Sequence, residues 1–330
     1  MPLAKVDCTN ENGGKDICSE FGVSGYPTLK IFKGGEFAQE YSGPREADGI
    51  VKYMKSQVGP ASRSYTSVTD LSKRLKDAKE VVVLGVFNSD SDDLYKKFTK
   101  TADKLRESVD FAHIIVDAAA GDSLSSLQGV PTLHPPTVVL VRPSVLSNKF
   151  EPGHVVYSEG DLTSWVKDNF HGLVGIRTQD NMDAFKNPLV VVYFDVDYTK
   201  NPKGTNYWRN RVLKVAKGFE KVRFAISSSS GFAGEIDEFG LSVPSGKDAT
   251  PVVGARDADG KKYVMNEKFS VEALQSFVEN LVEGRLTPHV KSEELPEDNS
   301  GPVKVAVGKN FEELVTKTDK DTLIEFCKLL

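Results

Sequence analysis

The sequence contains few cysteines, no long apolar run and no concentration of basic residues. Its three cysteines, Cys8, Cys18 and Cys327, are too few for a disulfide scaffold and too dispersed for a structural zinc site, which needs four ligands. No apolar run approaches the roughly 18 residues of a membrane-spanning helix. A net charge of −5 over 330 residues gives no reason to expect nucleic acid as a partner, because phosphate binding requires a concentrated basic face.

Motifs for metals and cofactors are also missing. The five histidines show no ligand spacing. Residues 240–247 suggest a phosphate-binding loop, but the glycines are too far apart and Asp248 replaces the Ser/Thr of that motif. Residues 257–260 resemble part of a calcium loop whose other ligands are absent. We therefore expect no metal and no cofactor.

Neither end of the sequence carries a signal that would target the protein to a compartment. Residues 1–8 lack the apolar segment of a signal peptide. Residues 325–330 do not form the acidic tetrapeptide that retains proteins in the endoplasmic reticulum. From its residues alone, the sequence predicts no compartment.

One pattern of strands and helices repeats at a spacing of about 110 residues. A proline followed by an apolar strand occurs at Pro27, Pro136 and Pro251. A short, mainly apolar run, typical of a central strand buried on both faces, occurs at residues 81–87, 189–194 and 322–326. The repeat predicts tandem α/β units, each with a mixed central sheet and flanking helices.

The sequence also predicts hairpin turns, a closing helix in each unit, and one linker. The pairs Gly34-Gly35 and Asp259-Gly260 predict hairpins and therefore antiparallel strands. Residues 292–302, rich in Glu, Pro, Asp and Ser, predict a linker. Apolar residues at helical spacing predict a closing amphipathic helix in each unit: Ile50, Val51 and Met54; Leu162, Trp165 and Val166; and Leu274, Phe277, Val278 and Leu281.

Several motifs resemble the protein disulfide isomerase family. Residues 22–28 (GVSGYPT) and 43–45 (GPR) resemble the second half of one of its catalytic domains. Residues 195–198 (DVDY) and 206–212 (NYWRNRV) resemble the branch that works with the lectin chaperones calnexin and calreticulin. The resemblance covers essentially the whole chain and implies tandem thioredoxin-like domains.

The family order of domains is a, b, b′ and a′. The resemblance implies that residues 1–59 are the C-terminal half of a catalytic a domain, residues 60–172 a non-catalytic b domain, and residues 173–285 a non-catalytic b′ domain. Residues 286–302 are then a linker and residues 303–330 the N-terminal stub of a catalytic a′ domain.

The Cys-Gly-His-Cys motif that carries the family's redox chemistry is absent from the 330 residues. A helix N-terminus stabilises the thiolate of that motif in the family. We expect the chain as it stands to be inactive in thiol–disulfide exchange. We interpret it as incomplete, with active-site segments missing at both ends through a skipped exon or an interrupted gene; a real isoform is the alternative.

The resemblance also assigns roles to residues near the missing motifs. Pro27 matches the family's cis-proline, which contacts peptide backbone; an ordinary turn proline is the alternative. Arg45 matches the arginine that swings toward the buried active-site cysteine, Lys5 and Glu325 match the two halves of a buried charge pair, and Cys327 matches the tail of a motif. Because an unpaired buried charge is costly, we expect Arg45, Lys5 and Glu325 to be ordinary surface charges.

Cys8 and Cys18 match two cysteines that form a structural disulfide in the calnexin-linked branch. The alternative is a pair of inert thiols. In either case the two residues have no catalytic role.

The resemblance implies a partner site on b and b′. Lys149, Lys203 and Arg211 match positions that hold the acidic tip of the lectin chaperones' arm. The alternative is a solvated helix face. A helical wheel places Arg211 beside an apolar face and Lys214 and Lys217 away from it; that face consists of Trp208, Val212, Val215 and Phe219.

The resemblance therefore implies a protein-folding factor and chaperone of the endoplasmic reticulum lumen. Its partners would be calnexin, calreticulin and unfolded glycoprotein clients, with no nucleic acid and no membrane insertion. The alternative function is a non-catalytic thioredoxin-repeat scaffold without a lectin-chaperone partner.

Overall fold

The computed structural model describes residues 3–326 apart from residues 42, 44, 117–126, 128–129, 131, 245 and 247–248. The chain divides into two compact units, Met1–Lys55 and Ser56–Leu330.

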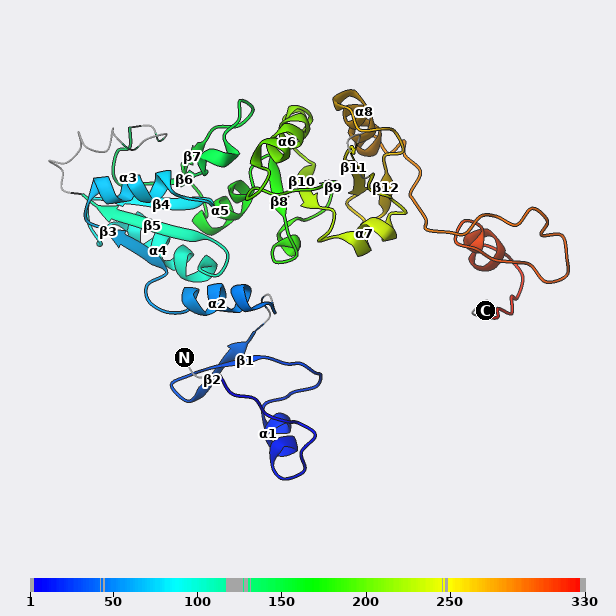
Figure 1. The fold of residues 1–330 in the computed structure, drawn as a ribbon, viewed down its shortest axis with the longest axis horizontal. Helices are drawn as coiled ribbons and strands as arrows, with labels where there is room; N and C mark the ends of the chain where they lie inside the picture. The colour runs from blue at the N-terminus through cyan, green and yellow to red at the C-terminus, as the bar shows by residue number, and fades with distance from the viewer. Residues whose placement is uncertain are drawn as a thin grey trace. The chain divides into compact units, whose positions relative to one another are not determined.

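The first unit is a small hairpin with two helices (Figure 1). Its strands pair antiparallel across Gly34 and Gly35, which have φ values of 63° and 90°. Such left-handed backbone favours glycine, so the predicted hairpin is confirmed. Phe32 and Phe37 remain 46% and 47% exposed, which leaves the unit with little apolar core. The elements are α1 (Gly14–Glu20), β1 (Lys30–Lys33), β2 (Glu36–Glu40) and α2 (Ala47–Ser56).

The second unit begins with a five-stranded mixed sheet in the order β3-β5-β4-β6-β7, which with its helices is called domain b below. Its central strand β4 is buried at all six positions. Val83 and Phe87 share a core with α4 and α5, whereas Val82 and Leu84 share the opposite core with α3. The predicted central strand is confirmed. The elements are β3 (Ser62–Tyr65), α3 (Val68–Lys76), β4 (Val82–Phe87), α4 (Asp93–Leu105), β5 (Asp110–Ile115), β6 (Thr137–Val141), the short helix η2 (Ser144–Leu146), β7 (His154–Val156) and α5 (Leu162–Phe170).

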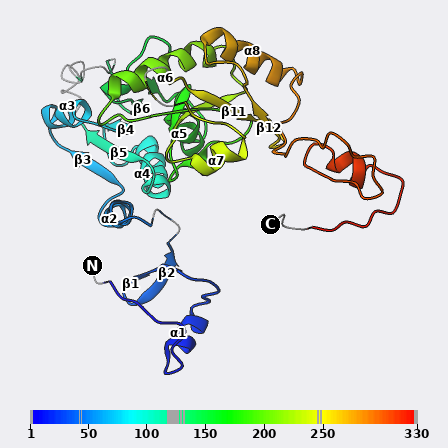
Figure 2. The ribbon, with the colours of Figure 1, turned by 45° about the vertical axis from the view of Figure 1, so that its right-hand side comes forward.

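A second five-stranded sheet in the same unit, which with its helices is called domain b′ below, repeats this arrangement in the order β12-β11-β9-β10-β8. The predicted strand β9 is again buried throughout, and α6 and α8 lie on one side of the sheet with α7 on the other (Figure 2). The prediction of tandem units with mixed sheets and flanking helices is confirmed. The elements are β8 (Val174–Arg177), the short helix η3 (Met182–Ala184), β9 (Leu189–Phe194), α6 (Pro202–Ala216), β10 (Arg223–Ser228), α7 (Ala233–Glu238), β11 (Val252–Arg256), β12 (Lys262–Val264) and α8 (Val271–Val282).

Helix α6 begins at a strong local signal. The side chain of Asn201 accepts a hydrogen bond from the Gly204 N–H at 3.0 Å, and Pro202 occupies the first turn. The predicted apolar face is confirmed, because Val212 and Val215 are buried. The same buried side of the helix also carries a charged residue, Arg209, which the helical wheel did not place in the core.

The prediction of a strand at residues 322–326 is wrong. These residues are described and contain no strand, and Leu323 and Phe326 are 100% and 82% exposed. An apolar run forms a strand only where a neighbouring strand completes its hydrogen bonds, and within the described part of the chain none does so here. The C-terminal segment carries one π-helical turn, η4 (Glu312–Thr316).

Helices suited to crossing a lipid bilayer are absent from the described residues, since none is both long and apolar enough.

Candidate functional site

A cavity of about 220 Å³ lies where a loop of domain b meets helix α6 of domain b′. Its lining is basic with one aromatic ring. The described residues contain no group of three His, Cys, Asp or Glu side chains that could hold a metal ion. The cavity is lined by Lys149, Phe150, Asn210, Arg211 and Lys214.

The b loop is shaped by Asn148. Its side-chain oxygen accepts hydrogen bonds from the N–H groups of Phe150 and Glu151, at 2.8 and 3.0 Å. This turn leaves Lys149 exposed, while Phe150 packs against the core of domain b′. The ring of Phe150 is also close to two cations, with the Nζ atoms of Lys149 and Lys217 at 5.5 and 5.7 Å from its centroid.

Arg211 is held in place by its own helix. Its guanidinium carbon lies 3.4 Å from the centroid of the Tyr207 ring, and the guanidinium donates to the Tyr207 carbonyl at 3.0 Å. These contacts restrict the side chain before any partner arrives, which lowers the entropy that binding would cost.

The cations at this surface have no acidic counterpart. In the part of the chain that the structure describes, no carboxylate lies within 4.0 Å of Lys149, Lys203, Arg211 or Lys214. Uncompensated charges of one sign create a potential that attracts anionic ligands. Of the sequence-predicted residues, Lys149 and Arg211 line the cavity, whereas Lys203 is exposed at the start of α6, two turns before Asn210.

Lys214 is a site residue that the sequence reasoning missed. It points away from the apolar face of α6, as the helical wheel predicts, but the b loop covers that side of the helix and brings Lys149 and Phe150 to it. The periodicity of one helix carries no information about a loop from another domain. A basic residue eleven positions after Lys203, on the same helix face, was the only available signal.

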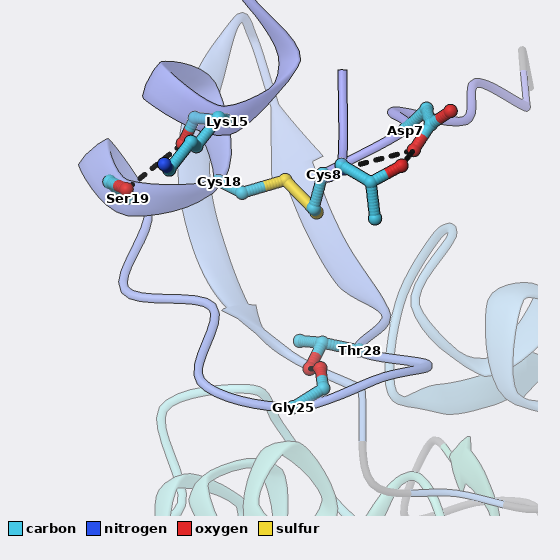
Figure 3. Close-up of a disulfide and its surroundings, with 8 residues drawn as sticks. Asp7, Cys8, Lys15, Cys18, Ser19, Gly25 and Thr28 are labelled. Atoms are coloured by element: carbon cyan, nitrogen blue, oxygen red, sulfur yellow. Dashed lines mark hydrogen bonds between the residues drawn. A yellow bond between two sulfur atoms is a disulfide. The ribbon is translucent and has the colours of Figure 1, made fainter. Parts of the chain in front are cut away.

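The first unit contains the Cys8–Cys18 disulfide, with Cα atoms 5.6 Å apart (Figure 3). It also contains the cis peptide bond between Tyr26 and Pro27. Nearby, the hydroxyl of Thr28 donates to a backbone carbonyl at 2.7 Å. The disulfide joins the two cysteines, and the cis bond precedes the proline, that the resemblance names.

The other residues matched to the missing active sites form no site. Lys5, Arg45 and Glu325 are all exposed, in line with the expectation of surface charges. Cys327 lies outside the described residues.

Domain b′ has a second group of charged residues, between its sheet and α7. Arg177 donates to both carboxylate oxygens of Glu235, at 2.7 and 3.2 Å, and Arg256 lies 3.7 Å from the same carboxylate. Burial, reinforced by the negative charge of Glu235, raises the pKa of Tyr193 far above its ordinary value. Both arginines thus neutralise Glu235, whereas the Tyr193 hydroxyl and Arg177 Nε are buried without a hydrogen-bond partner among the described residues.

Comparisons with known proteins assign the family. The thioredoxin-like domain family matches residues 87–280, and the thioredoxin family matches residues 1–56. Protein disulfide-isomerase A3 of Gallus gallus is 45% identical over 99% of this chain and 64% of its own length. The chain belongs to the protein disulfide isomerase family. Protein disulfide-isomerase A4 of Homo sapiens is 39% identical, over 99% of this chain and 50% of its own length.

A solved structure also matches. The crystal structure of the bb fragment of ERp72 is similar with a TM-score of 0.58 and 32% identity, covering 70% of this chain and 100% of that fragment. The chain spans between half and two thirds of the length of the two curated protein disulfide isomerases above.

Proposed function

We propose that domains b and b′ form a docking module for an acidic protein loop, the tip of the arm of calnexin or calreticulin. The module would belong to a folding factor of the endoplasmic reticulum lumen that carries out thiol–disulfide exchange on glycoprotein clients. The observation that carries the proposal is the cavity, where Lys149 of one domain meets Arg211 and Lys214 of the next with no carboxylate within 4.0 Å in the described chain.

The chemistry of the cavity suits such a loop. The guanidinium of Arg211 can hold a carboxylate through two parallel hydrogen bonds. Lys149 and Lys214 add charge that speeds the encounter with an acidic partner. Phe150 offers an apolar surface to a side chain beside the acidic group.

The test is a titration of the chain with a calreticulin arm fragment. We expect binding that weakens as salt is raised, since screening reduces the attraction between exposed charges. Arg211→Ala should weaken binding about tenfold, which corresponds to about 1.4 kcal/mol. Lys261→Ala is the matched control, because this exposed lysine lies in the hairpin at the far edge of the b′ sheet and should leave the affinity unchanged. Binding unaffected by Arg211→Ala would contradict the proposal.

The absence of any Cys-x-x-Cys motif in the 330 residues favours a second candidate, a non-catalytic scaffold. We expect the chain to reduce insulin disulfides no faster than a solution without it. A folded chain that is inactive in this assay and also fails to bind the arm fragment would favour the scaffold without a lectin partner.

A further inference from the structure

Arg209 is buried at the junction of domains b and b′. It is 1% exposed and is the largest fully buried side chain in the described part of the chain. Its guanidinium donates to the Val174 carbonyl at 3.1 Å, to the Leu146 carbonyl at 3.3 Å and to Glu151 Oε1 at 2.8 Å. One side chain of b′ therefore bonds its own domain and two positions of domain b.

Glu151, the partner of Arg209 in domain b, is satisfied on both oxygens. Oε1 also accepts from the Asn148 side chain at 3.2 Å. Oε2 accepts from the Leu173 N–H at 2.9 Å and lies 3.9 Å from Arg142 Nε. The carboxylate is thus bonded from its own loop and from the start of domain b′.

The chain passes from b to b′ at Gly172, and only glycine fits there. Its φ is 66°, in the left-handed region. A Cβ atom at this position would lie 2.4 Å from Glu151 Oε2. The connection between the domains is therefore shaped around the buried carboxylate, and any side chain at position 172 would displace it.

The buried pair lies beside the proposed docking site. Lys149 is two residues before Glu151, and Arg211 is two residues after Arg209. A further bond from the Asn206 side chain to the backbone of the b loop, 2.8 Å long, fixes the same segment against α6. The contacts that join the two domains thus also set the spacing of the two cations.

We propose that Glu151 and Arg209 are positioning residues that hold b and b′ in one orientation, so that Lys149 and Arg211 engage a single acidic ligand together. This inference rests on the proposed docking function. A buried ion pair is a weak source of net stability, but it penalises every arrangement that leaves either charge unpaired. A site fixed in this way spares the ligand the cost of ordering it.

The test is a double-mutant cycle measured by affinity for the calreticulin arm fragment. In the otherwise native chain, Lys149→Ala and Arg211→Ala should be non-additive by at least about threefold, because each cation assists the other in a fixed site. The same cycle is then measured in Glu151→Gln/Arg209→Met, which removes both charges of the pair while Arg142 keeps its hydrogen bonds to the Pro152 and Asn169 carbonyls. In this background the effects of Lys149→Ala and Arg211→Ala should be additive. With both cations still present, its affinity for the arm fragment should be about tenfold lower than that of the native chain.

Gly172→Ala is a second variant that should disturb the contact between the two domains. It retains both charges but forces Glu151 aside, and it should also abolish the coupling between Lys149 and Arg211. A purely stabilising role would lower the unfolding midpoint and leave the coupling intact. Native coupling and native affinity in both folded backgrounds would overturn the inference.

Residual dipolar couplings separate this inference from the docking function. In the unliganded native chain, domains b and b′ should share one alignment tensor, and in Glu151→Gln/Arg209→Met or Gly172→Ala their tensors should differ. If the native chain fails to bind the arm fragment, the docking function fails while the tensors still decide whether the pair orients the domains. Unchanged tensors in both variants would overturn the orienting role.

Discussion

Protonation of His171 should weaken the fold below neutral pH. His171 ends helix α5, immediately before the connection between the domains. Its ring contacts those of Phe185 and Phe170, with centroids 4.4 and 5.0 Å away. Burial, and secondarily the positive charge of Arg223, lowers the pKa of His171 to about 4.

The sign and size of the effect follow from the difference between the two states. In the unfolded chain the histidine pKa is about 6.5. Between these values the unfolded chain takes up a proton that the folded chain does not, so stability falls as the pH falls. Lowering the pH from 7 to 5 should therefore cost about 2 kcal/mol of unfolding free energy through this residue.

The measurement is urea denaturation at pH 7 and pH 5 for the native chain and for His171→Gln, which cannot titrate. Burial also lowers the pKa of His113, but that residue is present in both proteins and its contribution cancels. The native chain should lose about 2 kcal/mol more than the variant between the two pH values. Equal losses in the two proteins would refute the assignment of a half-buried, neutral imidazole at position 171.

Three further predictions concern stability. Glu235→Ala should destabilise domain b′ by about 3 kcal/mol in urea denaturation, because it leaves the buried Arg177 unpaired. Replacing Cys8 and Cys18 by serine should lower the stability of the first unit by about 3 kcal/mol, because the disulfide restricts the unfolded chain by closing the loop between them; amide exchange across α1 reports the loss. In hydrogen exchange the amides of β4 and β9 should be the slowest, because both strands are buried throughout, and those of residues 303–326 among the fastest.

Each of these predictions has a result that would contradict it. Asp237→Ala is the control for Glu235→Ala, because Asp237 forms an exposed pair with Lys291 and should cost less than about 1 kcal/mol; equal effects would contradict the argument from burial. Unchanged exchange in α1 after reduction would contradict the role of the disulfide. Equal protection throughout the chain would contradict a difference between the central domains and the C-terminal segment.

The repeat and its central strands could be predicted because they depend on local pattern. A wholly apolar run such as that at residues 189–194 suits a strand whose side chains are buried on both faces of a sheet, because helices cover both faces. The same reasoning failed at residues 322–326, where a shorter run that includes Glu325 has no neighbouring strand to pair with among the described residues. Sequence pattern reports which residues suit a strand, but the hydrogen bonds that form one belong to another segment.

The candidate site was predictable only in part, for a related reason. Lys149 and Arg211 followed from the resemblance, whereas Lys214 joined them only once the b loop was seen against α6. In the sequence, Arg209 is one of several basic residues on this helix, and no pattern indicates that it is buried. Its role depends on Glu151, 58 residues earlier in the chain, and no periodicity connects the two.

By itself, the sequence determined the family, the tandem α/β units, their central strands and hairpins, and the lack of a Cys-x-x-Cys motif. These follow from short-range patterns of apolar, turn-forming and reactive residues. The tertiary structure decided that Arg209 is buried against Glu151, that Gly172 must lack a side chain, and that cations from two domains share one cavity. Burial and pairing are set by distances in space, and the order of residues along the chain does not specify those distances across a domain boundary.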